Sequence, residues 1–139
     1  MADSLAIVAS CMSLLEAISK VSDDVKAFAI DISGARMEME TLSREFNDLV
    51  PLIHKVKDRC GVNSIGANLP GNIMQEISHD LYACLQVVVR LQVLLRKVSS
   101  SKMKRMKWSV STKGEAEKQR RSIQAHRTAL ATALALYPL

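Results

Sequence analysis

The residues of this 139-residue chain that are able to do chemistry are few and scattered. Its cysteines and histidines lack a second ligand at the spacing of a zinc site: Cys11, His54, Cys60, His79, Cys84 and His126. No glycine-rich phosphate cradle follows a predicted strand, and no nucleophile elbow is present. We therefore expect a protein that is not an enzyme and that binds neither a metal nor a cofactor.

The cysteines fall on apolar positions of predicted helices, where a thiol packs as a small buried hydrophobic group. Their odd number and wide spacing, with no basic segment at the N-terminus, predict a reducing, cytoplasmic location. The longest uncharged apolar runs, residues 4–15 and 81–89, are shorter than the roughly 20 residues of a transmembrane helix. We expect a soluble protein with no conventional membrane span.

Positive charge is concentrated in the last third of the chain. Residues 1–95 carry eight Lys and Arg against twelve Asp and Glu, whereas residues 96–139 carry eleven against two. Seven cations follow one another there without an intervening acid: Arg96, Lys97, Lys102, Lys104, Arg105, Lys107 and Lys113. We expect residues 99–114 to form a basic loop between two helices.

Three interpretations of this basic loop remain open. It is compatible with a solvated loop that confers solubility, or with a surface for anionic lipid, which attracts each Lys or Arg by roughly 1 kcal/mol. Nucleic acid is unlikely, since no recognition-helix motif and no set of stacking aromatics accompanies the charges. The candidates for contact with an anionic surface are Lys102, Lys104, Arg105, Lys107 and Trp108.

The second candidate site is the first predicted helix, which is apolar on more than one side. As a structural element it is a helix buried in a bundle, and as a functional element it is a helix that leaves the bundle and enters a membrane. The candidates for membrane insertion are Leu5, Ile7, Val8, Met12, Leu14 and Leu15.

The elements that carry these residues are all predicted to be helices. Apolar residues make up 48% of the chain and aromatic residues 4%, with only five Gly and three Pro, which favours long helices with aliphatic cores. We predict an all-α fold, a single four- to five-helix bundle over residues 1–139. Its helices are expected at about residues 4–20, 22–32, 35–60, 73–98 and 115–136.

Two of these helices show a sustained apolar rhythm with alternating spacings of four and three residues, which is typical of packed helices. In residues 35–60 this rhythm crosses Pro51, where we expect a kink or a break. Polar residues at 22–24 predict a helix start there, and Asn72 with Gln75 predicts a capping box that follows a loop at residues 61–72.

The opening residues 1–15, MADSLAIVASCMSLL, carry a family resemblance that continues through Val21, residues 42–52 and 91–98, Lys107-Trp108 and the last helix. In these positions the chain resembles the HeLo-like N-terminal domains of fungal NOD-like receptors of the STAND/NACHT class. The resemblance covers nearly the whole chain and is most specific at its start.

This resemblance implies a helical bundle of programmed cell death, heterokaryon incompatibility and innate immunity. Such a domain oligomerises on a signal from its receptor, is recruited from the cytoplasm to the plasma membrane, and engages the membrane through its N-terminal helix. Expected partners are other copies of the chain, other helical signalling domains and anionic lipids. The alternative is a protein–protein adaptor domain without membrane activity.

Overall fold

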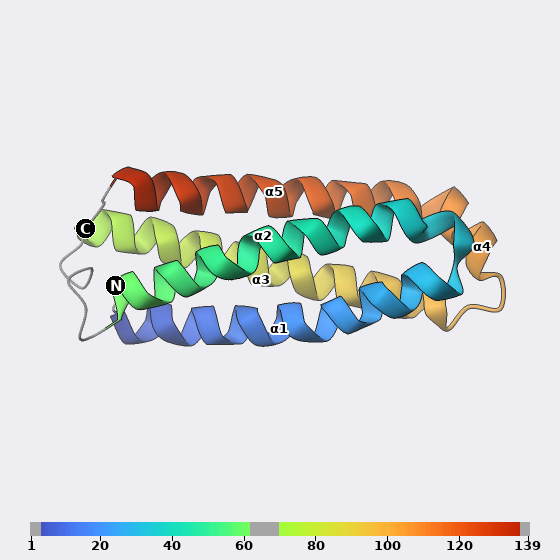
Figure 1. The fold of residues 1–139 in the computed structure, drawn as a ribbon, viewed down its shortest axis with the longest axis horizontal. Coiled ribbons are helices and arrows are strands. Elements are labelled where there is room, and N and C mark those ends of the chain that lie inside the picture. The colour runs from blue at the N-terminus through green and yellow to red at the C-terminus, as the bar shows by residue number, and fades with distance from the viewer. Residues whose placement is uncertain (1–3, 62–69, 137–139) are drawn as a thin grey trace.

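The computed structural model describes residues 4–61 and 70–136, and within these ranges the chain is helical with no strand (Figure 1). The four long helices are α1 (Ser4–Asp31), α2 (Arg36–Cys60), α3 (Gly71–Ser99) and α5 (Lys113–Leu136). A short 3-10 turn, η1 (Ser33–Ala35), joins α1 to α2. The helical turn α4 (Lys104–Lys107) and the π-helical turn η3 (Trp108–Thr112) lead into α5. The predicted all-α bundle is confirmed.

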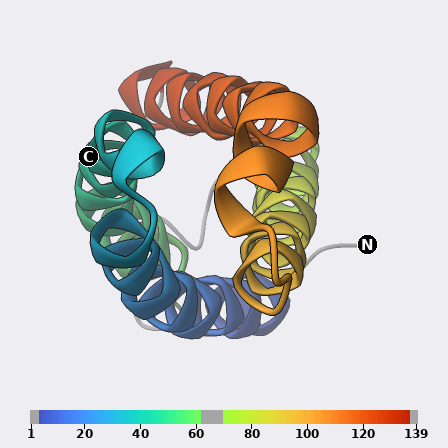
Figure 2. The ribbon, with the colours of Figure 1, turned by 90° about the vertical axis from the view of Figure 1, so that its right-hand side faces the viewer.

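The four long helices lie at the corners of a square when the bundle is viewed along its length (Figure 2). Helix α1 contacts α2 and α3, and α5 contacts the same two helices, so that α1 lies diagonally opposite α5. Interhelical contacts show the directions. Asp24 in the last third of α1 meets Arg96 near the end of α3, and both helices begin at the same end of the bundle, so they run parallel (Figure 1). Helices α2 and α5 are parallel as well, because Glu45 meets Arg120 and Arg59 meets Leu134.

The apolar rhythm of α2 and α3 forms the centre of the core, as predicted. Every position of both rows is at most 2% exposed. Burial of each such side chain contributes about 1.5–3 kcal/mol relative to exposure. The rows consist of Met39, Leu42, Phe46, Leu49, Ile53, Val56 and Cys60 in α2, and of Ile77, Leu81, Cys84, Val88, Leu91, Leu95 and Val98 in α3.

Helix α1 is continuous over 28 residues, so the predicted division into helices at 4–20 and 22–32 is wrong. Its buried row continues through the proposed boundary, since Val21 and Val25 are both fully buried. Asp24 does not cap a helix; it accepts hydrogen bonds from Gln92 and Arg96 of α3, each at 3.3 Å. Burial of a continuous apolar row outweighs the modest preference of Ser and Asp for helix starts.

Pro51 lies inside α2, so of the two expected outcomes, a kink or a break, the break is not found. Its side chain is exposed, while Leu49 and Ile53 on either side are fully buried. The hydrogen bond that proline cannot donate is therefore lost on the solvent side, where water can satisfy the free carbonyl. Packing of the inward row keeps the helix in one piece.

The start of α3 also differs from the prediction. Pro70 occupies the cap position, and its carbonyl accepts hydrogen bonds from the backbone N–H groups of Ile73 and Met74 at 3.0 and 3.1 Å. Asn72 and Gln75 are exposed and form no capping box. Most of the predicted loop at 61–72 lies outside the described residues.

The basic loop predicted at residues 99–114 is helical over most of its length. Helix α4 and the π-helical turn η3 cover residues 104–112, and α5 already begins at Lys113. The composition of serines and lysines resembles that of a loop, but the turn is ordered by an apolar contact of Trp108 with α1, which is described below.

We predict that Pro51→Ala stabilises the bundle. Alanine supplies the missing N–H group and removes the clash of the ring with the carbonyl of Asn47, which together cost up to about 3 kcal/mol in a helix interior. Chemical denaturation is expected to show a free energy of unfolding about 2 kcal/mol higher than that of the parent. Lys55→Ala, at another exposed position of α2, is expected to change it by less than about 0.5 kcal/mol. A loss of stability in Pro51→Ala would contradict this account.

Candidate functional site

The six candidate residues for membrane insertion divide between two faces of α1. Ile7 and Leu14 are fully buried and belong to the core row. Leu5 and Met12, seven residues apart on the opposite side, are 68% and 56% exposed. Val8 and Leu15 are half-buried between these faces. The folded bundle therefore presents two of the six candidates to solvent and hides two others.

The continuity of α1 corrects the expectation that no segment is long enough to span a membrane. Its most apolar window of 18 residues has a mean hydropathy of 1.6, and only 28% of that window is buried. Its 28 residues extend over about 42 Å, whereas the hydrocarbon core of a bilayer is about 30 Å thick. Length and composition alone also admit the core helices of soluble proteins, which are mostly buried.

Polar contacts fasten the C-terminal half of α1. The carboxylate of Asp24 lies 3.3 Å from the guanidinium of Arg96, and that of Asp31 lies 2.9 Å from the ammonium of Lys104. In the N-terminal half, Glu16 and Lys20 pair with each other at 3.1 Å along the helix. This half is packed into the bundle through its apolar row of Ile7, Cys11, Leu14 and Ile18.

Trp108 is a core residue, which corrects its assignment to an exposed anionic-surface site. It is 1% exposed, and its ring lies 5.2 Å from that of Phe28 in an edge-to-face arrangement. The π-helical turn places Trp108 and Thr112, four residues apart, against the bundle. No signal of this burial is present in the sequence, because Trp108 follows a run of bases and precedes polar residues.

The cations around Trp108 are only partly free. Lys104 is engaged by Asp31, whereas Lys102, Arg105 and Lys107 form no ion pair with a residue that the structure describes. Three apolar side chains stand among them, Met103, Met106 and Val110, with exposed fractions of 59%, 56% and 79%. We call this surface the basic end: Lys102, Met103, Arg105, Met106, Lys107 and Val110.

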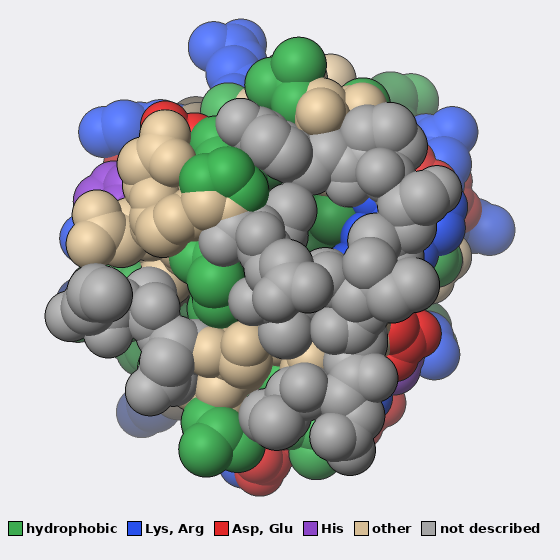
Figure 3. Space-filling model, turned by 90° about the vertical axis from the view of Figure 1, so that its left-hand side faces the viewer, with side chains coloured by type: hydrophobic (Ala, Val, Ile, Leu, Met, Phe, Trp, Pro, Cys, Tyr) green, Lys and Arg blue, Asp and Glu red, His purple; other side chains and the backbone are tan. Residues whose placement is uncertain are grey.

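The basic end and the start of α1 lie at opposite ends of the bundle (Figure 1). The bundle is about as long as α1, so roughly 40 Å separate the two candidate sites. At the end where α1 begins, the Lys and Arg side chains lie mostly at the rim of the face (Figure 3). A flat membrane that meets the basic end head-on therefore does not reach Leu5.

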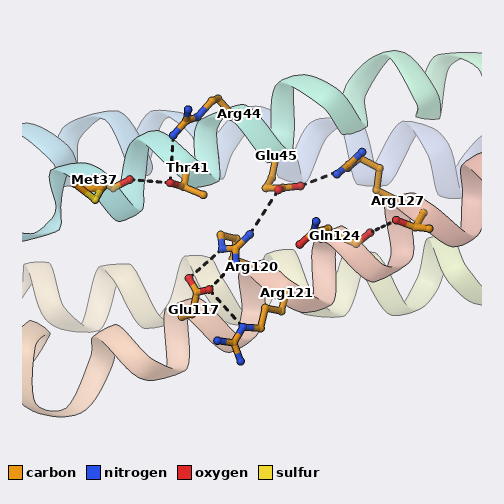
Figure 4. A network of polar contacts seen from close by, with 10 residues as sticks. Met37, Thr41, Arg44, Glu45, Glu117, Arg120, Arg121, Gln124 and Arg127 are labelled. Atoms are coloured by element: carbon orange, nitrogen blue, oxygen red, sulfur yellow. Dashed lines mark hydrogen bonds and ion pairs between the residues drawn. The ribbon is translucent and has the colours of Figure 1, made fainter.

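A network of charges lies between α2 and α5 (Figure 4). Glu45, whose side chain is 11% exposed, faces Arg120 at 3.6 Å and Arg127 at 3.4 Å. Arg120 also donates two hydrogen bonds to Glu117, and these hydrogen bonds lower the pKa of the Glu117 carboxyl below its usual value. Each acid of the network faces two arginines, so the cluster joins the helices α2 and α5.

The thiols are buried and protonated at neutral pH. Burial raises the pKa of Cys11 and of Cys84 to about 12, and it also raises that of Cys60. His126 lies 3.4 Å from Asp80 between α5 and α3, while His54 and His79 are exposed. Within residues 4–61 and 70–136, no group of three His, Cys, Asp or Glu side chains is placed to hold a metal ion.

Comparisons of the chain with family models, with curated proteins and with solved structures find no match. The geometry of α1 and of the basic end is therefore the basis for the function proposed below.

We predict that Glu45→Ala destabilises the bundle by about 3 kcal/mol, because it leaves two arginines facing a poorly hydrated contact without their carboxylate. The matched control is Glu16→Ala, which removes an acid from the exposed pair with Lys20 and is expected to cost about 0.5 kcal/mol or less. Thermal or chemical denaturation measures both changes. Equal losses in the two variants would show that the network does not hold α5 against α2.

Proposed function

We propose that this chain is a membrane-targeting effector domain of regulated cell death or innate immunity, which oligomerises and acts through its N-terminal helix. The observation that carries the proposal is α1, a helix long and apolar enough to cross a bilayer, with only 28% of its most apolar window buried. The resemblance to HeLo-like domains supplies the biological setting, with recruitment from the cytoplasm to the plasma membrane.

The composition of α1 supports insertion of its first part. Residues 4–22 carry only Glu16 and Lys20, which neutralise each other, and they extend over about 28 Å as a helix. This length matches a hydrocarbon core of about 30 Å. The acids that follow, Asp23 and Asp24, would then lie at the interface with water.

The polar contacts at the C-terminal half of α1 support an order in which the two ends of this helix leave the bundle. Release from the N-terminal end breaks apolar contacts, which lipid chains can replace, whereas release from the C-terminal end breaks the ion pairs of Asp24 and Asp31 first. We propose that the basic end attracts the domain to anionic lipid. The bundle then lies along the surface, which brings α1 to the membrane, and α1 separates from its start onward.

Small side chains on α1 support oligomerisation in the membrane. Ala9, Ser13 and Ala17 recur every four residues, and the first two are exposed in the bundle. Helices in lipid approach each other closely along such small residues, because dispersion contacts and interhelical hydrogen bonds drive their association. Several released α1 helices would pack along this row.

A second function, that of an adaptor without membrane activity, is favoured by the outer face of α3. Tyr82, Val89 and Val93 recur there at spacings of seven and four residues and are 62%, 42% and 57% exposed. Such a row is typical of a surface that receives a helix of a partner. In this alternative, α1 stays in the bundle throughout.

We predict that Met12→Lys abolishes leakage of dye from anionic liposomes while leaving the bundle folded. Met12 is 56% exposed, so lysine meets no packing conflict in the folded state, but it costs about 3 kcal/mol at the centre of a bilayer. Tyr82→Lys, at a similarly exposed position of α3, is the matched control and is expected to leak like the parent.

The reactivity of a buried thiol reports the release of α1 from the bundle directly. In a variant that retains Cys11 alone, maleimide is expected to react slowly in solution and faster on anionic liposomes, because release of α1 exposes the buried thiol.

Leakage that is equal in Met12→Lys and in the parent, or a thiol that stays protected during leakage, would rule out insertion of α1. No leakage by the parent at all would favour the adaptor.

We predict that Arg105→Glu weakens binding to anionic liposomes about fivefold or more, because one cation near a charged surface contributes about 1 kcal/mol. Lys55→Glu makes the same change in net charge on an exposed part of α2 far from the basic end, and it is expected to have a smaller effect. Co-sedimentation at two salt concentrations measures both. Equal effects would show that net charge, and not the basic end, attracts the lipid.

A further inference from the structure

A hollow of the surface lies between α1 and α2, near the turn η1 that joins them. It is an open groove of about 1080 Å³. Its lining extends over residues 25–30 of α1 and 36–44 of α2, which are neighbouring segments of the same helical hairpin. Ligand sites in proteins enclose about 300–1000 Å³, so this groove has room for a lipid-sized molecule.

The inner part of the groove is apolar. Val25 and Met39 are fully buried and form its base, and Ala29 is partly buried between them. Because the side chain of Ala29 is small, it occupies little of the space between the two helices. Ile30 forms part of the wall and is 87% exposed, so an apolar ligand in the groove would remove this side chain from water.

The rim of the groove is cationic, with bases on both of its walls. Lys26 stands on α1, and Arg36 and Arg44 stand on α2. The only acid in the lining is Glu40, which Arg36 already binds at 3.2 Å. Lys26 forms no ion pair with a described residue, and Arg44 donates only a long hydrogen bond of 3.4 Å to Thr41. Two cations therefore remain for an anionic ligand.

We propose that this groove binds one long-chain fatty acid, with the acyl chain along Val25, Ala29 and Met39 and the carboxylate between Lys26 and Arg44. An apolar base below a rim with two uncompensated cations matches a molecule with one apolar chain and one negative charge. An acidic peptide helix would bring several charges to a rim that offers only two. The inference is independent of the entry of α1 into membranes, because it concerns binding of a monomeric lipid to the folded bundle.

The bound fatty acid would contact both α1 and α2, and it would reinforce the end of the hairpin at which α1 is held. A ligand that binds only the closed bundle stabilises it in proportion to the logarithm of its concentration. We therefore expect the fatty acid to raise the Tm of the full chain and to slow the reaction of Cys11 with maleimide.

The test is a titration of the full chain with a fluorescent long-chain fatty acid below its critical micelle concentration. We expect saturable binding of one molecule, about tenfold weaker in Arg44→Glu, which corresponds to about 1.4 kcal/mol. Ala29→Phe fills the groove and is expected to abolish binding. The matched controls are Arg90→Glu on α3 and Ala125→Phe on α5, two exposed positions outside the groove, and both are expected to bind like the parent.

Three results would overturn the proposal. The first is equal binding of the fatty acid and its uncharged methyl ester. The second is equal binding by the parent, Arg44→Glu and Ala29→Phe, and the third is binding of an acidic helical peptide without binding of the fatty acid. If Ala29→Phe loses its helical circular dichroism, Lys26→Glu replaces it, because this exposed side chain is not needed for folding. Failure of liposome leakage leaves this result unaffected, so the two proposals fail separately.

Discussion

The carboxylates of the first helical hairpin face the cations of the second along the two contacts in which neighbouring helices run parallel. Asp24 and Asp31 of α1 meet Arg96 and Lys104, while Glu38 and Glu45 of α2 meet bases at the start of α5. Parallel helices gain no help from their dipoles, which lie side by side in the same direction. Opposite charges at matching heights offset this, and the contacts of Glu45, whose side chain is 11% exposed, are the least screened by water.

This pairing also explains the uneven distribution of charge along the chain. Part of the excess of bases after residue 95 is used inside the molecule, where it neutralises the acidic first half. Among the bases after residue 95, Lys102, Arg105 and Lys107 form no ion pair with a described residue, and they lie at the basic end beside exposed methionines. Internal pairing thus leaves a local basic surface at this end of the molecule, apart from the cationic rim of the groove between α1 and α2.

Because of this pairing, the two halves of α1 are held in the bundle by different contacts. Charged contacts hold the C-terminal half, and an apolar row holds the N-terminal half. In the proposed function, the apolar end is the one that separates into lipid, and the charged end remains with the bundle. The groove beside η1 lies at the end that is held, where a ligand would reinforce the connection between α1 and α2. Both proposals therefore concern the hairpin of α1 and α2. Insertion of α1 into a membrane would open this hairpin, whereas binding of a fatty acid would stabilise it.

The sequence by itself determined the helices and the inward rows of α2 and α3, because the rhythm of Leu42, Leu49 and Ile53 reports which side of a helix avoids water. It also determined the lack of a recognisable catalytic motif. Only the tertiary structure decided the continuity of α1, the burial of Trp108, the separation of the two candidate sites and the groove at Ala29. The continuity of α1 and the burial of Trp108 depend on contacts between residues distant in the chain, and local propensities for caps and loops are weaker than such contacts. The groove depends on how the two helices of one hairpin pack against each other.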